Sequence, residues 1–406
     1  MKRYAVVAAF IAYAVASRGA ENLSPVLQLQ QRLAANHQIL TFDWSRGYLD
    51  SLLRELDIPV SSQVLVISKT SVQRDRISPQ TPRAIYFNDN VYVGWVPGGD
   101  FIELSDVDAS FGAAFYAIPQ SPAGPRIIPR ADCMQCHQTL NTLNVPGYIV
   151  ESSVTRADGF ALRRIDDYRG GHRTPLEARW GGWYVSGEAS GDRHLGVDDL
   201  SQVDLPRYLS PNSDIVALMV LEHQTRMHNL ITQAHRYVAD NASATNRQQL
   251  ADVAEPLLEY MLFRDEAPLH GVVTGASSFA RDYQERGPRD SKGRSLRDLD
   301  LTTRLLKYPC SPLIYSPSFD ALTEPLKEYL WQRLAQILSG ADSRPVYAQM
   351  SAQDRRNVFE ILRDTKPEFA AWLSRHGLKD SQVISRARSD LPSVRKSDRL
   401  ARRPER

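Results

Sequence analysis

The sequence predicts an α+β fold, with a strand-rich segment first and an all-helical region after it. Short runs of β-branched and aromatic residues, separated by turn residues, fill much of residues 64–186. From residue 213 onward, apolar residues recur at the spacing of a helix face instead. A content of 42% hydrophobic and 24% charged residues is that of a globular protein. We therefore expect an α+β domain over residues 21–205 and a helical region over residues 206–378.

The N-terminus is predicted to be a signal peptide that covers residues 1–20. Lys2 and Arg3 precede an uncharged run from Ala5 to Ala16, whose end supplies the small-residue pattern of a cleavage site. An N-terminal membrane anchor is the alternative, but spanning a bilayer takes about 20 apolar residues and this run is shorter. No later segment approaches that length. We expect a periplasmic or secreted protein without a transmembrane segment after signal cleavage.

Two helices are expected before the strands, over residues 26–36 and 45–56, because leucines recur there at helical spacing. Turn residues at Asn88 to Asn90, and at Asp158 with Gly159, indicate two hairpins. The predicted strands cover residues 64–67, 84–87, 91–96, 101–107, 113–118, 148–155, 160–165 and 180–186.

The second half of the chain has the apolar periodicity of helices. The helices are predicted at residues 214–239, 246–263, 296–306, 323–338 and 351–363. On the first of them, His223 falls within the apolar arc, whereas His228 and His235 fall on a more polar flank. Residues 379–406 hold nine Lys/Arg and four Asp/Glu, a net charge of +5, and are predicted to form a basic disordered tail.

Charge and cysteine content exclude several classes of protein. A net charge of +2, from 49 basic and 47 acidic residues, argues against a general nucleic-acid binder. The three cysteines are too few for a disulfide framework or for several iron–sulfur clusters. Cys310 is distant from the other two and is expected to be a buried, inert thiol. The sequence therefore allows one site built on Cys133 and Cys136.

Cys133, Cys136 and His137 form a C-x-x-C-H motif, the attachment signature of a c-type haem. Two thiols one helical turn apart can add to the two vinyl groups of haem, and the adjacent imidazole can reach the iron as proximal ligand. Asp132 can cap the short helix that carries them. Such attachment takes place outside the bacterial cytoplasm, in agreement with the predicted signal peptide. We expect one covalent haem c, with its iron bound by His137.

Two other kinds of site use paired cysteines. A thioredoxin-like redox pair should follow a strand in a βαβ unit, but this motif follows a loop that contains Pro125 and Pro129. A structural zinc site usually needs a second Cys/His pair at compatible spacing, and the sequence contains no second CxxC or HxxxH. The haem interpretation is favoured because the histidine directly follows the second cysteine.

The motif resembles that of c-type cytochromes, and this resemblance covers only residues 133–137. The chain differs from a class I cytochrome c, because no methionine lies between Met134 and Met219 to serve as axial ligand. A haem motif between two groups of strands is similar to exported sensor domains with a PAS-like fold. Val216 to His235 and Lys307 to Leu322 resemble uncharacterised bacterial cytochrome c-like proteins, a resemblance that implies no particular activity.

The ligand on the other side of the iron would set its potential and reactivity. His223 is a candidate because a histidine within an apolar arc needs a partner. The alternative is a core histidine that is hydrogen-bonded to protein. His172 and His194 are candidates because their glycine-rich loops can approach a flat cofactor closely. Each of these two could instead be a histidine of a surface loop.

Electron transfer is the function that these residues predict best: an exported mono-haem cytochrome that exchanges single electrons with a redox partner protein. One alternative is a haem enzyme for peroxide or nitrogen-oxide chemistry, with an open iron position and an acid/base such as His172 or His194. Another is a haem-based redox or gas sensor, although the sequence shows no output module. No catalytic residue is assigned from the sequence.

Overall fold

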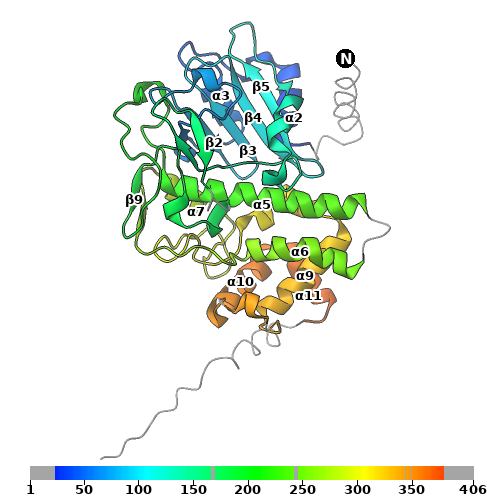
Figure 1. Ribbon diagram of the computed structural model, residues 1–406. Coiled ribbons are helices and arrows are strands. Elements are labelled where there is room, and N and C mark those ends of the chain that lie inside the picture. Colours follow the sequence, from blue (N-terminus) through cyan, green and yellow to red (C-terminus); the bar gives the residue numbers. More distant parts are fainter. Residues whose placement is uncertain (1–22, 166–169, 242–245, 343, 349, 379–406) are drawn as a thin grey trace, which may run out of the picture.

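The computed structural model describes residues 23–165, 170–241, 246–342, 344–348 and 350–378. The predicted signal peptide and the predicted basic tail lie outside these residues. A sheet with two helices beside it forms one end of the protein, helix α5 crosses the middle, and further helices form the other end (Figure 1). The α+β class predicted from the sequence is confirmed.

The main sheet has six antiparallel strands, each paired with its neighbour in sequence. Between the second and third strands, the Asn88 side chain accepts hydrogen bonds from the amides of Asn90 and Val91, which closes the predicted hairpin turn. A PAS sheet places strands distant in sequence side by side, so this meander differs from the PAS-like order. The strands are β1 (Val64–Val66), β2 (Arg83–Phe87), β3 (Val91–Trp95), β4 (Phe101–Asp108), β5 (Gly112–Pro119) and β6 (Ile128–Pro129).

Most of the predicted helices are present within one or two residues of their expected bounds. The apolar periodicity that identified them is also what buries one side of each against the core. The helices that match in this way are α2 (Pro25–Ala35), α5 (Ile215–Asp240), α6 (Arg247–Met261), α9 (Glu324–Leu338) and α10 (Ala352–Thr365). Helix α3 (Leu49–Glu55) begins four residues later than expected, and α7 (Phe279–Glu285), α8 (Pro317–Asp320) and α11 (Pro367–Arg375) were not predicted.

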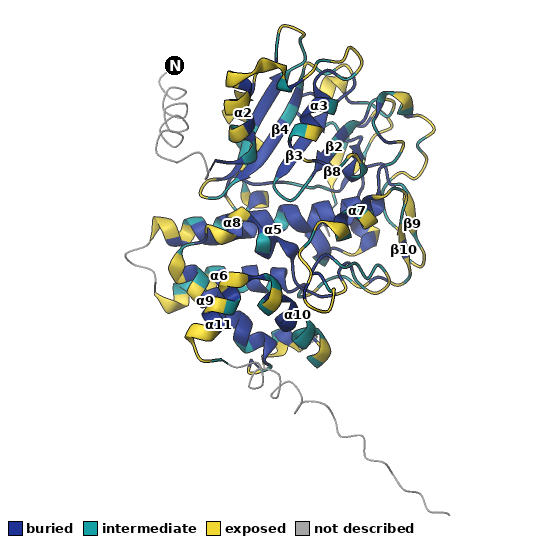
Figure 2. Cartoon of the chain, turned by 180° about the vertical axis from the view of Figure 1, so that it is seen from behind, coloured by how far each residue is buried: buried dark blue, intermediate teal, exposed yellow. Residues whose placement is uncertain are grey.

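Helices α2 and α3 cover one face of the main sheet. Tyr86, Val93 and Leu104 are direct cross-strand neighbours on this face, and they share a buried cluster with Val26 of α2 and Leu52 of α3. Figure 2 shows the outer side of α2 exposed. Strand β3 is buried at every position, because successive side chains enter two different cores, one on each face of the sheet. A slip of one residue would exchange these two sets of side chains, so burial on both faces fixes the register.

Helix α5 serves two hydrophobic clusters and is buried along most of its length (Figure 2). Its first turns, from Val216 to Leu221, pack with Phe87 and Tyr92 from the other face of the sheet. Further along, Met227 and Leu230 pack with α6, α9, α10 and α11. His228 and His235, expected on a polar flank, are both buried because α5 has neighbours on several sides.

The predicted boundary between residues 205 and 206 is crossed by secondary structure and by a core. Strand β9 (Gly187–Ala189) pairs with β10 (Val273–Gly275), which lies in the part expected to be all-helical. The cluster around the first turns of α5 also includes Trp180 and Trp183 from the part before the boundary. The two parts are thus joined through shared burial.

Two sequence predictions of secondary structure are wrong. Residues 296–306, expected to form a helix, are turns and bends, and Leu296 and Leu305 are buried from an irregular backbone. Residues 180–186, expected to form a strand, make only isolated bridges, such as Tyr184 with Val197. In both segments the apolar residues are buried and recur at the spacing of a helix or a strand, but the backbone does not make the hydrogen bonds of either element.

The second hairpin is present where Asp158 and Gly159 predicted it. It consists of β7 (Ser153–Thr155) and β8 (Ala161–Arg164). Residues 148–152, which were also expected in the first of these strands, have no strand structure. Within the described part of the chain, no helix is both long and apolar enough to cross a bilayer.

Candidate haem site

The C-x-x-C-H motif occupies one turn of helix beside the main sheet. A 3-10 turn, η5 (Ala131–Cys133), leads into α4 (Met134–His137). Cys133 is half-buried, and Cys136 is exposed. Asp132 makes no side-chain cap of this helix; its carboxylate is paired with Arg130 at 2.7 Å instead. Both thiols therefore lie at the surface, three positions apart on a short helix.

The ring of His137 is held by a backbone carbonyl. Its Nδ1 lies 2.9 Å from the carbonyl oxygen of Gly147, and its ring centroid lies 4.4 Å from that of Phe115 on β5. A carbonyl can only accept, so Nδ1 carries the proton and Nε2 keeps its lone pair. Burial lowers the pKa of His137, which favours this neutral form. His137 is thus prepared as a nitrogen ligand for a metal.

The surroundings of the motif suit an apolar cofactor with anionic groups. Leu140, three residues after His137, is 82% exposed, and Leu162 on β8 is 60% exposed. Arg164 on β8 donates to the side chain of Asn141 at 2.8 Å and is also paired with the carboxylate of Glu151, so an anionic group at this turn would share the guanidinium with Glu151. Exposed leucines gain free energy when an apolar group covers them, and arginine pairs well with carboxylates. These residues and the donor set of the motif fit a covalently attached haem.

His172 and His223, both predicted as candidate ligands, contact each other in the protein interior. Their Nδ1 atoms lie 2.9 Å apart, and Nε2 of His223 lies 2.8 Å from the hydroxyl of Ser311. The His223 ring also stacks on Phe263 and Tyr260. Both nitrogens of His223 therefore have protein partners. This is the arrangement of a core histidine, the alternative that the sequence left open.

The third candidate, His194, lies in a loop near Trp180. Its Nε2 is 3.4 Å from the carboxylate of Asp198, and its ring centroid is 5.4 Å from that of Trp180. Burial is the main cause that lowers the pKa of His194. The residues described do not place His194 in contact with the C-x-x-C-H motif. Its role as an iron ligand stays a prediction, as do those of His172 and His223.

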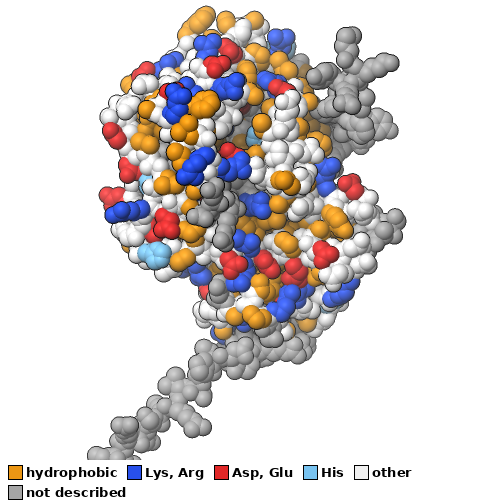
Figure 3. Space-filling model, viewed as in Figure 1, with side chains coloured by type: hydrophobic (Ala, Val, Ile, Leu, Met, Phe, Trp, Pro, Cys, Tyr) orange, Lys and Arg blue, Asp and Glu red, His pale blue; other side chains and the backbone are white. Residues whose placement is uncertain are grey.

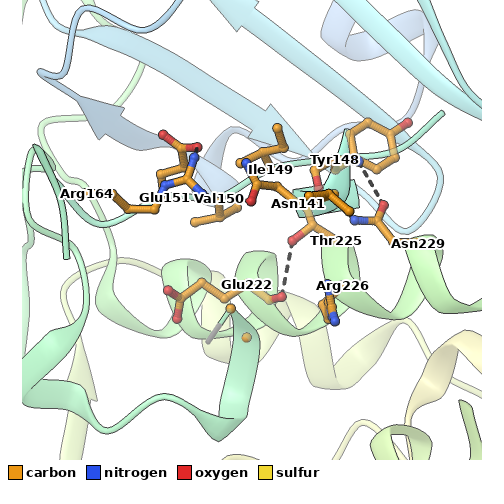
Figure 4. Close-up of a pocket in the computed structure, with 13 residues that line it drawn as sticks. Asn141, Tyr148, Ile149, Val150, Glu151, Arg164, Glu222, Thr225, Arg226 and Asn229 are labelled. Atoms are coloured by element: carbon orange, nitrogen blue, oxygen red, sulfur yellow. Dashed lines mark hydrogen bonds and ion pairs between the residues drawn. The ribbon is translucent and has the colours of Figure 1, made fainter. Parts of the chain in front are cut away.

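A pocket of about 630 Å³, including its open mouth, lies beside the turn that follows the motif, and residues 133–137 do not line it (Figure 4). Leu140 and Asn141 line it from the turn after the motif, and Arg164 lines it from β8. Figure 4 shows residues 148–151 on one side and Glu222, Thr225, Arg226 and Asn229 of α5 on the other. The lining is rich in polar side chains, so the pocket suits a small polar molecule.

The pocket contains residues that the sequence did not single out, above all Glu222 and Asn229. They lie seven residues apart on α5, two helical turns, and so share one side of that helix. Both are almost wholly buried. This spacing of polar residues in a mostly apolar helix is the signal that could have identified them. A search for groups of three or more His, Cys, Asp or Glu able to hold a metal ion finds none in the described part of the chain.

Acid should destabilise the protein through its buried histidines. Burial lowers the pKa of His228 to about 4, and its Nε2 donates to the carbonyl of Asp89 at 2.8 Å. Because the pKa of His228 in the folded protein is below the usual 6.5, the unfolded chain binds a proton at this histidine before the folded protein does. The folded protein therefore loses free energy of unfolding as the pH falls from 6.5 toward 4. When the pH is lowered from 7 to 4.5, we expect the free energy of unfolding, measured by urea denaturation, to fall by about 2 kcal/mol less in His228→Gln than in the wild type.

The control for this prediction is His37→Gln, because His37 is exposed. Its loss of stability between the two pH values should equal that of the wild type. Equal losses in the wild type and the His228→Gln variant would contradict the assignment of acid sensitivity to His228.

The comparisons with known proteins give no relative for this chain. No protein-family model matches it, no curated protein matches it, and no solved structure matches it. The function is therefore argued from the geometry of the site.

Proposed function

We propose that the protein is an exported c-type cytochrome with one covalent haem, and that it transfers single electrons. The observation that carries the proposal is the hydrogen bond from Nδ1 of His137 to the Gly147 carbonyl, next to two accessible thiols at the attachment spacing. A redox-active cysteine pair gives no reason for this orientation of the adjacent histidine, whereas a haem iron bound by His137 does. A zinc ion bound by His137 would use the same orientation, but within the described residues no group of three or more His, Cys, Asp or Glu is placed to hold a metal ion.

Each residue of the motif has a separate task in this function. Cys133 and Cys136 tether the cofactor by thioether bonds, so that it is not lost during repeated use. His137 presents Nε2 to the iron, and Gly147 holds the ring in the required tautomer. When bound, the haem supplies an iron that alternates between the ferrous and ferric states. Because the His137 ring is fixed by the Gly147 carbonyl, it needs little rearrangement when the charge on the iron changes.

The polar pocket favours a second candidate function, a haem enzyme. Arg226 and Glu222 line the pocket from α5, and Arg164 lines it from the other side. A pocket with charged groups next to a haem could bind a small polar substrate. Electron transfer remains the first proposal, because it requires only the motif and its support.

The proposal includes a redox partner protein. We do not expect one strongly charged patch on the described surface to steer this partner into place. On the face shown in Figure 3, basic and acidic side chains lie interspersed. The arginine-rich segment after residue 280 is largely paired within the protein: Arg286 with Asp57 at 2.9 Å and Arg289 with Asp298 at 3.1 Å. We therefore expect the described surface to contribute only weakly to any dependence of the electron-transfer rate on ionic strength.

The test is to express the full chain in a host that matures c-type cytochromes and to purify it from the exported fraction. We expect one haem per chain that stays attached after denaturation and gives the pyridine spectrum of a thioether-linked haem. A low-spin spectrum unchanged by cyanide or carbon monoxide supports electron transfer, whereas ready binding of either molecule supports the enzyme. Protein without covalent haem would refute both.

A further inference from the structure

The carbonyl that holds His137 belongs to a loop whose backbone is anchored at each successive residue. The Thr142 hydroxyl donates to the carbonyl of Val145 at 2.7 Å. The amide of Ala113 on β5 donates to the carbonyl of Pro146 at 3.0 Å. The amide of Gly147 donates to the carbonyl of His137 at 2.9 Å. The loop and the motif are therefore hydrogen-bonded to each other in both directions.

Asn229 of α5 provides the last anchor, and it does so with both ends of its amide. Its Oδ1 accepts from the amide of Tyr148 at 2.8 Å, and its Nδ2 donates to the carbonyl of Tyr148 at 2.8 Å (Figure 4). Asn229 is 1% exposed. A buried side-chain amide satisfied in this way fixes the backbone that it contacts, because breaking either bond leaves a buried polar group unpaired.

The approach of Asn229 to this loop requires glycine at position 147. A Cβ atom on Gly147 would lie 2.3 Å from Oδ1 of Asn229, closer than non-bonded atoms can come. The chain thus has its smallest residue where α5, the loop and the motif meet. The carbonyl that accepts the hydrogen bond from Nδ1 of His137 belongs to this same glycine.

We infer that Asn229 is a positioning residue for His137: by holding Tyr148 it fixes the Gly147 carbonyl, and through that carbonyl it sets the donor strength of the imidazole toward iron. The inference rests on the haem-binding function proposed above. It also assigns a task to α5, which links the helical half of the chain to the motif.

The direction of the effect follows from the hydrogen bond. A strong bond from Nδ1–H to a carbonyl makes the imidazole a better electron donor, which stabilises the ferric state and lowers the reduction potential. Without Asn229 the loop can move, and the bond to Gly147 weakens. The imidazole then donates less, so the reduction potential of the haem rises.

The experiment measures the midpoint potential of the haem-loaded protein in wild type and Asn229→Ala. A positive shift is expected in Asn229→Ala, together with lower thermal stability. Asn229→Ser is the second variant should Asn229→Ala fail to fold. It keeps a small polar group that cannot span both backbone groups of Tyr148, and a shift in the same direction is expected.

Gln63→Ala is the matched control. Gln63 is 1% exposed, and like Asn229 it holds one residue with both ends of its amide: Oε1 accepts from the amide of Ser210 at 3.2 Å, and Nε2 donates to the carbonyl of Ser210 at 2.7 Å. This variant should lose stability as the Asn229 variants do, with no shift in potential. An unchanged potential in the Asn229 variants, or an equal shift in Gln63→Ala, would overturn the inference. A wild type without covalent haem would instead remove the proposed function itself, and the inference with it.

Discussion

The double variant Cys133→Ala/Cys136→Ala is expected to contain no covalently attached haem. Both thioether bonds need a cysteine sulfur, and these two cysteines are the accessible ones: Cys133 is half-buried and Cys136 is exposed. Burial raises the pKa of Cys133 to about 11, so this thiol stays protonated at neutral pH until it is used. The measurement is haem staining of the denatured protein, with extraction into acidified acetone as the second readout.

Cys310→Ala is the control for this prediction and should retain the attached haem. Cys310 is completely buried, so its thiol cannot reach a cofactor at the surface. The same burial raises the pKa of Cys310, which keeps the thiol protonated. We expect a stability loss of about 1 kcal/mol from the small cavity. Haem that remains attached in the double variant would show that the C-x-x-C-H motif is not the attachment site.

Arg179→Met is expected to destabilise the folded protein by about 3–5 kcal/mol. Arg179 is 2% exposed, and its Nη1 donates to the fully buried carboxylate of Glu222 at 3.3 Å. Its other nitrogens donate to the carbonyls of Thr174 at 2.6 Å and His172 at 3.1 Å. Without the guanidinium, the carboxylate of Glu222 stays buried without its arginine. Urea denaturation at neutral pH measures the loss.

The double variant Arg179→Met/Glu222→Leu tests the reason for that loss. Replacing both charges by apolar side chains also removes the buried carboxylate, so the double variant should regain much of the stability that the single variant loses. The cycle separates charge from packing. A single-variant loss below about 1 kcal/mol would contradict the view that this ion pair is buried and essential.

The secondary structure of this protein could largely be predicted from local pattern. The run of strands up to β5 and the long helix α5 follow from apolar periodicity and turn residues, and these are properties of neighbouring residues. The prediction failed where burial did not require a regular backbone, as in residues 296–306. It also failed for His228 and His235, because the sequence cannot show that α5 has neighbours on several sides.

The candidate site also has a part that the sequence could predict and a part that it could not. Five consecutive residues, 133–137, identify the motif without any knowledge of the fold. The meeting of His172 with His223, 51 residues apart, could not be predicted, because it depends on how η7 (Gly171–Arg173) packs against α5. The same holds for the pocket, whose lining comes from segments that are far apart in the sequence.

The sequence by itself determined the α+β class and the C-x-x-C-H motif, because both depend on short-range spacing. Only the tertiary structure decided how His137 is held, since its partner Gly147 and the anchor of that loop, Asn229, come from other segments. Asn229 and Tyr148 are 81 residues apart in the chain. A hydrogen bond needs its two groups within about 3 Å, and only the packing of α5 against the loop brings groups so distant in sequence together.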